Sequence, residues 1–152
     1  HSPGPIMLHD ATHGLLIAGD QILASISPFV GTFGDAPHAS PVRDYLAFLD
    51  EAGAEIPEGT LILPGHGLPF RDVHARLASL KAHHLERLDQ MVEACRAEAQ
   101  TIRSLTRLLF KRDLTGVEPM AFAELLAHAN LLVDEGRLVP CEEGGVRHYR
   151  AG

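Results

Sequence analysis

The chain has 152 residues, enough for one compact domain or two small ones, and its 45% hydrophobic content argues against intrinsic disorder. Its formal charge of −7 argues against a general affinity for phosphate backbones, and no apolar run reaches the roughly 18 residues that a membrane-spanning helix needs. The two cysteines, Cys95 and Cys141, lack the spacing of a zinc knuckle, so a cytoplasmic protein with reduced thiols is expected.

The chain begins with His-Ser-Pro-Gly, without an initiator methionine and without a basic segment followed by an apolar one. This start predicts a proteolytic amino terminus or a fragment, and no secretion signal.

A hairpin and an irregular loop are predicted for the first part of the chain. Residues 6–9 and 15–18 favour β-strands, and the polar residues 10–14, which end in glycine, favour a turn between them. Asp20 comes directly after the second strand, where an aspartate commonly bonds its own backbone. Residues 25–41 are rich in serine, glycine and proline, and predict an irregular loop over the sheet edge, a kind of loop that often shapes a pocket.

A helix and a strand follow. Ser40 is predicted to cap the helix, Pro41 suits its first position, and Gly53 is predicted to end it. Leu61 then begins a short strand whose turn is built from glycines and prolines. That turn holds His66 at the rim of a sheet, where binding residues concentrate, although His66 could equally decorate the turn. The alternation of strands and helices predicts an α/β (α+β) fold in layers.

A long helix is predicted for residues 71–96. At 100° per residue, one face collects Val73, Leu77, Leu80, His84, Leu88, Met91 and Cys95. A histidine inside an apolar stripe is more often a hydrogen-bonded core residue than a ligand, and we favour that role for His84. Because the helix starts soon after the His66 turn, a pocket or supporting role stays open for His83, His84 and Arg87.

The remaining residues have the pattern of a winged helix, and we place a domain boundary between residues 1–96 and 97–152. The predicted elements are a helix at 101–110, a connector at 111–118, a helix at 119–135, a strand at 137–140, a turn at 142–145 and a strand at 146–150. The inward face of the second helix is predicted to hold Phe122, Leu125, Leu126, Ala129, Leu132 and Val133.

The charges of this segment argue against nucleic-acid binding. Residues 97–152 hold seven Lys or Arg and eight Asp or Glu, and the helix at 119–135 has no Lys or Arg. A groove-binding helix with that balance would repel phosphate. We therefore expect this segment to serve in packing or dimerisation.

Potential metal ligands stand at His1, Asp20 and His66, each at a predicted strand end. Such nitrogen and oxygen donors suit zinc, iron or manganese. A carboxylate bridging two metals, with a histidine on each, makes a hydrolytic centre in which metal-bound water becomes a hydroxide nucleophile. Three ligands spread over 66 residues have no diagnostic period, so spacing alone does not establish such a site.

Three motifs resemble a known family in order and spacing. His1-Ser-Pro-Gly4, Leu15-Leu-Ile-Ala-Gly-Asp20 and Leu63-Pro-Gly-His-Gly67 resemble the last three metal-binding motifs of the metallo-β-lactamase fold hydrolases. The continuation, with Ala82-His-His-Leu-Glu-Arg87, resembles the subgroup that carries a carboxy-terminal winged helix. That subgroup includes β-lactamase-like proteins described as ribonucleases, and glyoxalase-II-like hydrolases of unknown substrate.

The resemblance implies two zinc ions in an αββα fold, with iron or manganese as alternatives. His1 would bind one metal, His66 the other, and Asp20 would bridge them. Pro5 stands where the family usually has a second histidine, which is not normally a ligand. The family's H-x-H-x-D-H motif is absent, and it supplies the remaining ligands and the carboxylate that orients the water. The chain therefore resembles the carboxy-terminal half of such an enzyme.

The leading hypothesis is a metal-dependent hydrolase of esters, thioesters or phosphodiesters, acting on a small-molecule or nucleotide-type substrate. These 152 residues alone are predicted to be inactive, and to pair with an amino-terminal fragment or with a second copy. The rival hypothesis is a non-enzymatic winged-helix module that binds protein or nucleic acid.

Overall fold

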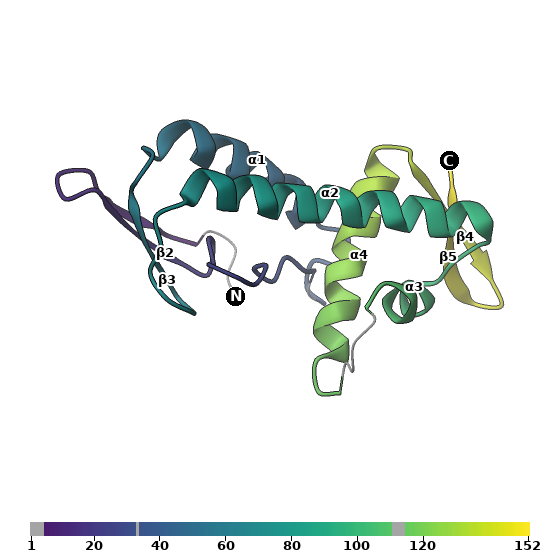
Figure 1. Cartoon of the computed structure of the whole chain (residues 1–152). Helices are drawn as coiled ribbons and strands as arrows, with labels where there is room; N and C mark the ends of the chain where they lie inside the picture. Colours follow the sequence, from purple (N-terminus) through teal and green to yellow (C-terminus); the bar gives the residue numbers. More distant parts are fainter. Residues whose placement is uncertain (1–4, 33, 111–114) are drawn as a thin grey trace. The chain divides into compact units, whose positions relative to one another are not determined.

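The structure is a computed structural model that describes residues 5–32, 34–110 and 115–152 (Figure 1). The elements are β1 (Leu8–Asp10), β2 (Leu15–Gly19), α1 (Pro41–Glu55), β3 (Leu61–Pro64), α2 (Val73–Ala97), α3 (Ile102–Leu109), α4 (Glu118–Asp134), β4 (Leu138–Glu143) and β5 (Val146–Ala151). The predicted mixed α/β class is confirmed. None of the helices in the described ranges is long and apolar enough to cross a membrane.

The chain divides into two compact units. Unit 1 comprises His1–Phe29 and Leu46–His83, and unit 2 comprises Val30–Tyr45 and His84–Gly152. Helices α1 and α2 each contribute residues to both units. The domain boundary expected between residues 96 and 97 concerns independent folding, and it stays a prediction.

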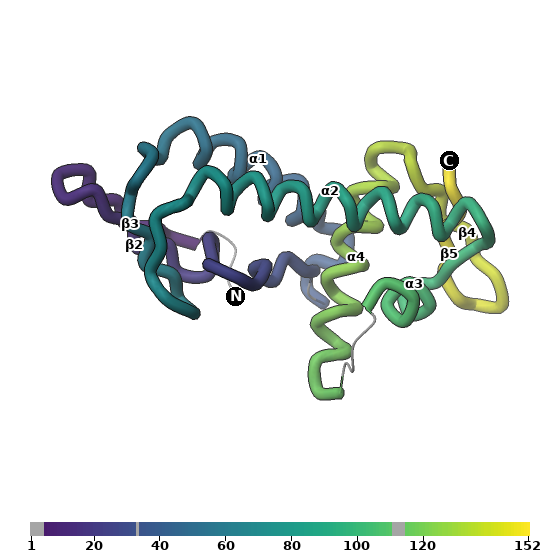
Figure 2. Tube along the Cα trace, in the orientation of Figure 1, coloured from purple at the N-terminus to yellow at the C-terminus, as the bar shows by residue number. Residues whose placement is uncertain are grey.

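Unit 1 holds a three-stranded sheet in the order β1-β2-β3. Strands β1 and β2 form the predicted antiparallel hairpin, with Leu8 opposite Ile17, and β3 runs parallel to β2. The path of this hairpin and of the loop that follows it can be traced in Figure 2. Strand β1 begins two residues later than expected and includes Asp10, whose carboxylate accepts the backbone N–H groups of Thr12 and His13 in the turn.

Only one face of this sheet is covered within the described part of unit 1. Leu16, Ala18 and Ile62 are buried, whereas Leu8 and Ile17 are 61% and 46% exposed. Successive strand residues point to opposite faces, so the buried and exposed residues separate by face. The helical residues buried in unit 1 are Leu49, Ala52, Val73, Leu77 and Leu80. In the same unit, Lys81 Nζ donates to Asp50 Oδ1 at 2.5 Å and joins α2 to α1.

Two predictions about the ends of α1 were wrong. Gly53 lies inside the helix, which continues to Glu55, and Pro57 follows shortly after; the residue before a proline is disfavoured in a helix. The hydroxyl of Ser40 is buried and has no hydrogen-bond partner among the described residues, so it caps nothing there. The backbone carbonyl of Ser40 accepts the N–H of Arg43 at 3.0 Å instead.

The apolar face predicted for α2 is confirmed, because all seven residues assigned to that face are buried. Its bounds differ from the predicted 71–96 by one or two residues at each end. Helix α3 begins with a capping box, in which Thr101 and Ser104 each accept the other's backbone N–H, at 3.0 and 2.9 Å. Residues 111–114 of the predicted connector lie outside the described residues.

The predicted inward face of α4 needs one correction. Leu125, Ala129 and Leu132 are buried, but Phe122 is 41% exposed. The helix is covered on more than one side, because residues 30–32 and 34–40 lie along it within unit 2. Thr32 N–H donates to the carbonyl of Ala123 at 3.2 Å, and the Asn130 amide donates to the carbonyls of Pro37 and Ala39 at 2.9 Å each.

The chain ends in a β-hairpin. Strands β4 and β5 pair in the register Leu138 opposite Ala151. Compared with the predicted 137–140 and 146–150, β4 begins one residue later and ends three residues later, and β5 ends one residue later. The connecting turn is shorter than predicted and consists of Gly144 and Gly145, both with positive φ, which suits the twist of the strands. Tyr149 pairs with Gln100, so the segment before α3 lies beside β5.

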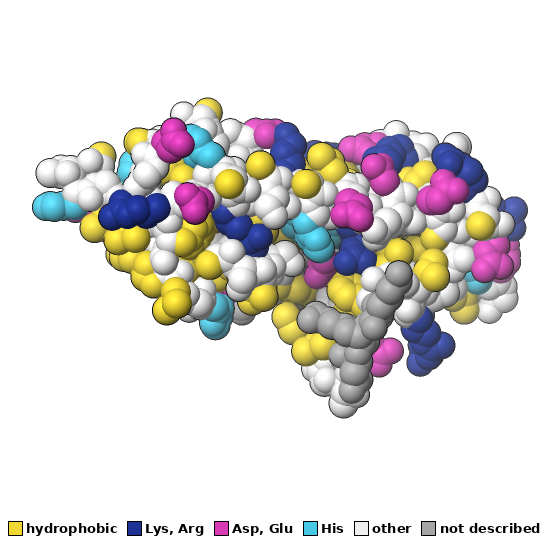
Figure 3. Space-filling model, in the orientation of Figure 1, with side chains coloured by type: hydrophobic (Ala, Val, Ile, Leu, Met, Phe, Trp, Pro, Cys, Tyr) yellow, Lys and Arg dark blue, Asp and Glu magenta, His cyan; other side chains and the backbone are white. Residues whose placement is uncertain are grey.

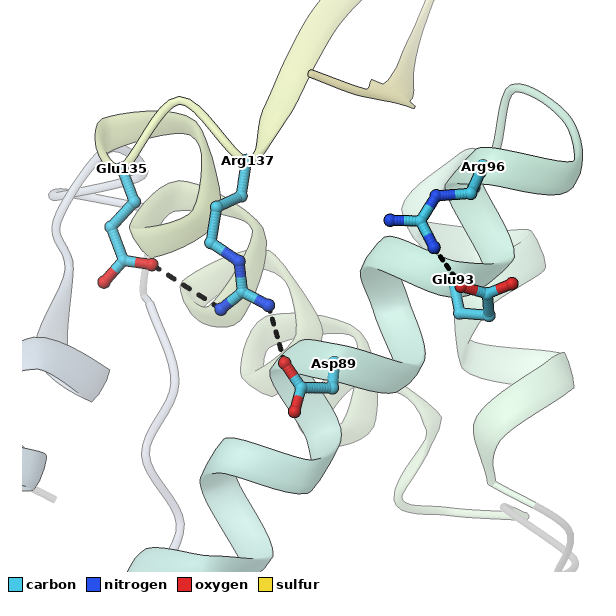
Figure 4. Close-up of polar contacts among 5 residues, drawn as sticks. All are labelled: Asp89, Glu93, Arg96, Glu135 and Arg137. Atoms are coloured by element: carbon cyan, nitrogen blue, oxygen red, sulfur yellow. Dashed lines mark hydrogen bonds and ion pairs between the residues drawn. The ribbon is translucent and has the colours of Figure 1, made fainter.

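Ion pairs lie at this end of unit 2 (Figure 4). Arg137, just before β4, donates to Asp89 of α2 at 2.6 Å and lies 3.8 Å from Glu135, while Arg96 and Glu93 pair along α2 at 2.6 Å. Figure 3 shows acidic and basic side chains interspersed on the face that it presents. Such exposed pairs contribute little to stability, roughly 0 to 1 kcal/mol each.

Candidate functional site

Asp20 follows the last residue of β2. Gly19 has φ +52° and the register of β2 with β3 shifts between Ile17 and Gly19, so the chain bends where the strand ends. The carbonyl of Gly19 accepts the N–H of Gly65 at 2.8 Å, and the N–H of Gln21 returns to the carbonyl of Ala18 at 3.1 Å. These bonds fix Asp20 beside the end of β3.

His66 stands in a short loop after β3. Ile62 and Phe70 close this loop with two backbone hydrogen bonds of 2.8 and 3.2 Å, and Gly67 adopts φ +85°, which favours glycine. The His66 side chain is 68% exposed. A strand followed by a closed loop of glycines and prolines therefore presents the imidazole at the sheet rim, as the sequence predicts.

The structure brings Asp20 and His66 together, and we call them the strand-end pair. His66 Nε2 lies 3.6 Å from Asp20 Oδ1. Gly65 permits this approach, because a Cβ at that position would overlap Asp20 Oδ1 and would lie 3.2 Å from the backbone carbon of Gly19. The absence of a side chain at residue 65 is thus required by the position of the carboxylate.

The donor set of the strand-end pair suits part of a metal site. A carboxylate and an imidazole on adjacent strand ends are ligands that zinc, iron and manganese accept, and both side chains are accessible. The third predicted ligand, His1, lies outside the described residues. Within the ranges that the structure describes, no group of three or more His, Cys, Asp or Glu is placed to hold a metal ion. Within the described residues, the pair therefore offers two potential metal donors.

His84 belongs to a buried aromatic cluster of unit 2. Its Nδ1 lies 3.0 Å from Nε2 of His128 on α4, and the two rings stack at 5.2 Å with an interplanar angle of 21°. Tyr45 of α1 contacts the His84 ring edge-on at 5.3 Å. Both histidines are fully buried. His84 is thus a packed and hydrogen-bonded residue, the role that the apolar stripe favours.

Arg87 is held by the carboxy-terminal end of α3. Its Nη1 donates to the carbonyl of Leu109 at 3.2 Å, and its guanidinium lies 4.6 Å from the centre of the Phe110 ring. Desolvation lowers the pKa of Arg87, and the nearby Glu124 and Glu86 oppose that shift. The side chain remains a cation at neutral pH. His83 is half-buried on α2 and belongs to unit 1. Pocket roles for these residues stay predictions.

Two important residues escaped the sequence analysis. Gly65 is part of the predicted turn, but only the packing of Asp20 against it shows why it is glycine. His128 lies in the apolar run of α4, and the signal that could have identified it is the one that singled out His84, a histidine among buried aliphatic residues.

The two thiols differ in their surroundings. Cys95 is buried on α2, and desolvation raises its pKa to about 11. Cys141 on β4 is half-buried, directly opposite His148 of β5. Both thiols are free.

Comparison with known proteins shows a consistent similarity. Residues 88–151 match the family model of the metallo-beta-lactamase-like C-terminal domain. A beta-lactamase domain protein from Burkholderia ambifaria matches with 36% identity and a TM-score of 0.90, covering 96% of this chain and 44% of that protein. A metallo-beta-lactamase family protein from Thermus thermophilus matches with 32% identity and a TM-score of 0.78, covering 93% of this chain and 43% of that protein. No curated protein matches the chain.

The chain therefore matches part of the fold of two metallo-β-lactamase family proteins, and it spans less than half the length of these solved relatives. The similarity to that superfamily, stated above as a resemblance, is confirmed at this level.

Proposed function

We propose that the chain forms the carboxy-terminal part of a metal-dependent hydrolase of the metallo-β-lactamase superfamily, which cleaves an ester, thioester or phosphodiester. The observation that carries this proposal is the strand-end pair, in which a carboxylate and an imidazole from separate strands lie 3.6 Å apart beside a glycine that makes room for them. The family match and the two solved relatives support it.

Each residue of the strand-end pair has a distinct role in the proposal. Asp20 would bridge two metal ions, His66 would bind one of them, and His1 would bind the other. When bound, the metals supply water with a pKa lowered toward about 7, which is a nucleophile at neutral pH. Zinc is the proposed metal, with iron or manganese as alternatives that the same donors accept.

The remaining ligands and the carboxylate that orients the water are proposed to come from a segment outside these 152 residues. A catalytic zinc usually takes three protein ligands, and Asp20 with His66 provides two. The exposed sheet face around Leu8 and Ile17 would then be covered by an amino-terminal segment or by a second copy of the chain. We expect the 152 residues alone to show no enzymatic turnover of a generic phosphodiester or thioester.

The test uses the longest encoded protein that contains this chain. Metal content and turnover are measured for the wild type, Asp20→Asn and His66→Ala, with His38→Ala as the control because His38 is an exposed histidine outside the pair. Both variants of the pair should lose at least one metal per chain and nearly all hydrolysis. The control should keep both.

Two results would contradict the proposal. One is an Asp20→Asn protein that still holds two metals per chain, which would remove the bridging role. The other is a monomer of 152 residues, free of any companion fragment, that binds two metals and hydrolyses either substrate.

A second candidate function is an interaction module of the winged-helix type, formed by α3, α4 and the β4–β5 hairpin. The order of these elements and the pairing of Gln100 with Tyr149 favour it. Nucleic acid is a poor partner for it, since residues 30–32 and 34–40 lie along one side of α4 and acidic residues outnumber basic ones from residue 97 onward. Tight duplex binding that falls steeply with salt, in a protein without metal, would favour this alternative.

A further inference from the structure

The buried histidine pair of unit 2, His84 and His128, has an arrangement of protons that the contacts determine. His128 Nδ1 lies 2.7 Å from the backbone carbonyl of Glu124, and a carbonyl can only accept, so this nitrogen carries a proton. In a neutral His128, Nε2 is then an acceptor, and His84 Nδ1 at 3.0 Å must donate to it. Each ring thus keeps one proton, and the bond runs from α2 to α4.

The surroundings of the pair oppose a further proton. Both side chains have zero exposure, so a charge on either ring would lose its hydration. Arg87 lies on α2 one turn after His84 and is a half-buried cation, whose Nε has no hydrogen-bond partner among the described residues. From α1, the edge of Tyr45 faces the His84 ring. From α4, Glu124 contributes a carboxylate, which interacts electrostatically with the Arg87 cation.

Protonation of both rings would also break the bond that joins the two helices, because His84 Nδ1 and His128 Nε2 would then both be donors that face each other. A proton on His128 Nε2 would place two N–H donors face to face unless His84 gave up its own Nδ1 proton. A proton on His84 Nε2 would leave the bond in place but would create a buried imidazolium near Arg87. In both cases the neutral chain from His84 through His128 to the Glu124 carbonyl is disturbed.

We propose that the His84–His128 pair is a pH-sensitive latch, which holds α4 on α2 while both rings are neutral and releases it when they are protonated. An unfolded-chain imidazole has an ordinary pKa of about 6.5, so below that pH the open form binds more protons than the closed form. Stability of the latch is therefore complete above about pH 6.5 and falls as the pH drops. The device is independent of the strand-end pair, which belongs to unit 1.

The experiment measures unfolding by denaturant between pH 5 and 8 for the wild type, the double variant His84→Gln/His128→Gln and the control His38→Gln. His38 is exposed in unit 2, so its loss should leave the latch intact. In the wild type, two protons taken up on opening should raise the unfolding equilibrium constant by up to about 100-fold per pH unit below pH 6. The control should show the same rise, whereas in the double variant the unfolding equilibrium constant should change much less with pH.

Site-resolved hydrogen exchange gives a second readout, which serves also if the double variant does not fold. After correction for intrinsic rates, amides of residues 125–132 should lose protection between pH 7 and 5.5 in the wild type, ahead of those in β1–β3. NMR of the imidazoles should show both rings neutral until that loss begins. Equal pH dependence in wild type and double variant, or an imidazolium at either residue in the protected protein, would overturn the proposal.

Discussion

Gly65→Ala should weaken metal binding at the proposed site while changing the free energy of unfolding only slightly. The added methyl group would overlap Asp20 Oδ1 and would lie 3.2 Å from the backbone carbon of Gly19 and 3.4 Å from Asp20 Cγ. Gly65 does not have a positive φ, so alanine introduces no backbone strain of that kind. The Asp20 carboxylate, on a part-exposed side chain, must rotate away, and the neighbouring backbone must shift by a few tenths of an ångström.

The expected effect is small on stability and large on metal binding. A single overpacked methyl at a site that can relax costs about 1 kcal/mol of unfolding free energy. Loss of the correct carboxylate position should weaken metal binding about 10- to 100-fold, the range found when a metal ligand's orientation is disturbed. Cobalt(II) or zinc titration of the longest encoded protein, beside thermal unfolding, measures both quantities.

Gly53→Ala is the matched control for this substitution. Gly53 lies inside α1 and a Cβ there meets nothing within 4 Å, so alanine should raise the unfolding free energy by about 0.5 to 1 kcal/mol and leave metal affinity unchanged. Metal affinity in Gly65→Ala equal to that of the wild type would refute the argument that Gly65 positions Asp20. A loss of stability of several kcal/mol would refute the claim that the effect is confined to the site.

Three further predictions concern unit 2. His84→Leu leaves Nε2 of His128 without its donor, so unfolding free energy should fall by about 1 to 3 kcal/mol with metal binding by the strand-end pair unchanged; loss of metal at an unchanged melting temperature would contradict this. Cys95 has its pKa raised to about 11, so its contribution to stability is complete below about pH 9 and is lost as the pH rises toward 11, by up to about 1.4 kcal/mol per pH unit; denaturant titrations should show this fall in the wild type and not in Cys95→Ala. At pH 8 an alkylating reagent should label Cys141 well before Cys95, as peptide mass analysis would show, and faster labelling of Cys95 would refute its burial.

Much of the local structure could be predicted from residue order. The periodicity of α2 identified every residue of its buried stripe, and glycines and prolines located the turns that present Asp20 and His66. These features are determined by residues that are close together in the sequence, so the sequence alone is enough to predict them. The metal roles of Asp20 and His66 stay predictions, but their positions at strand ends follow from the same local signals.

Features that join distant segments were decided by the tertiary structure. Phe122 was predicted inward because one apolar face was assumed for α4, whereas Thr32, Pro37 and Ala39 form hydrogen bonds with that helix and Phe122 is 41% exposed. Gly53 was predicted to end α1, but a glycine costs a helix only about 1 kcal/mol, which packing of the flanking turns can offset.

The strand-end pair and the histidine pair show most clearly which features the sequence determines and which features need the tertiary structure. Sequence alone determined that Asp20 and His66 each end a strand and that His84 lies in an apolar stripe. Only the pairing of β2 with β3 placed the carboxylate 3.6 Å from the imidazole, and only the docking of α4 placed His128 against His84. The physical reason is that the neighbours of a buried or crowded side chain come from distant parts of the sequence. His84 and His128 are 44 residues apart, and Asp20 and His66 are 46 residues apart, so the local pattern around one residue does not reveal the other.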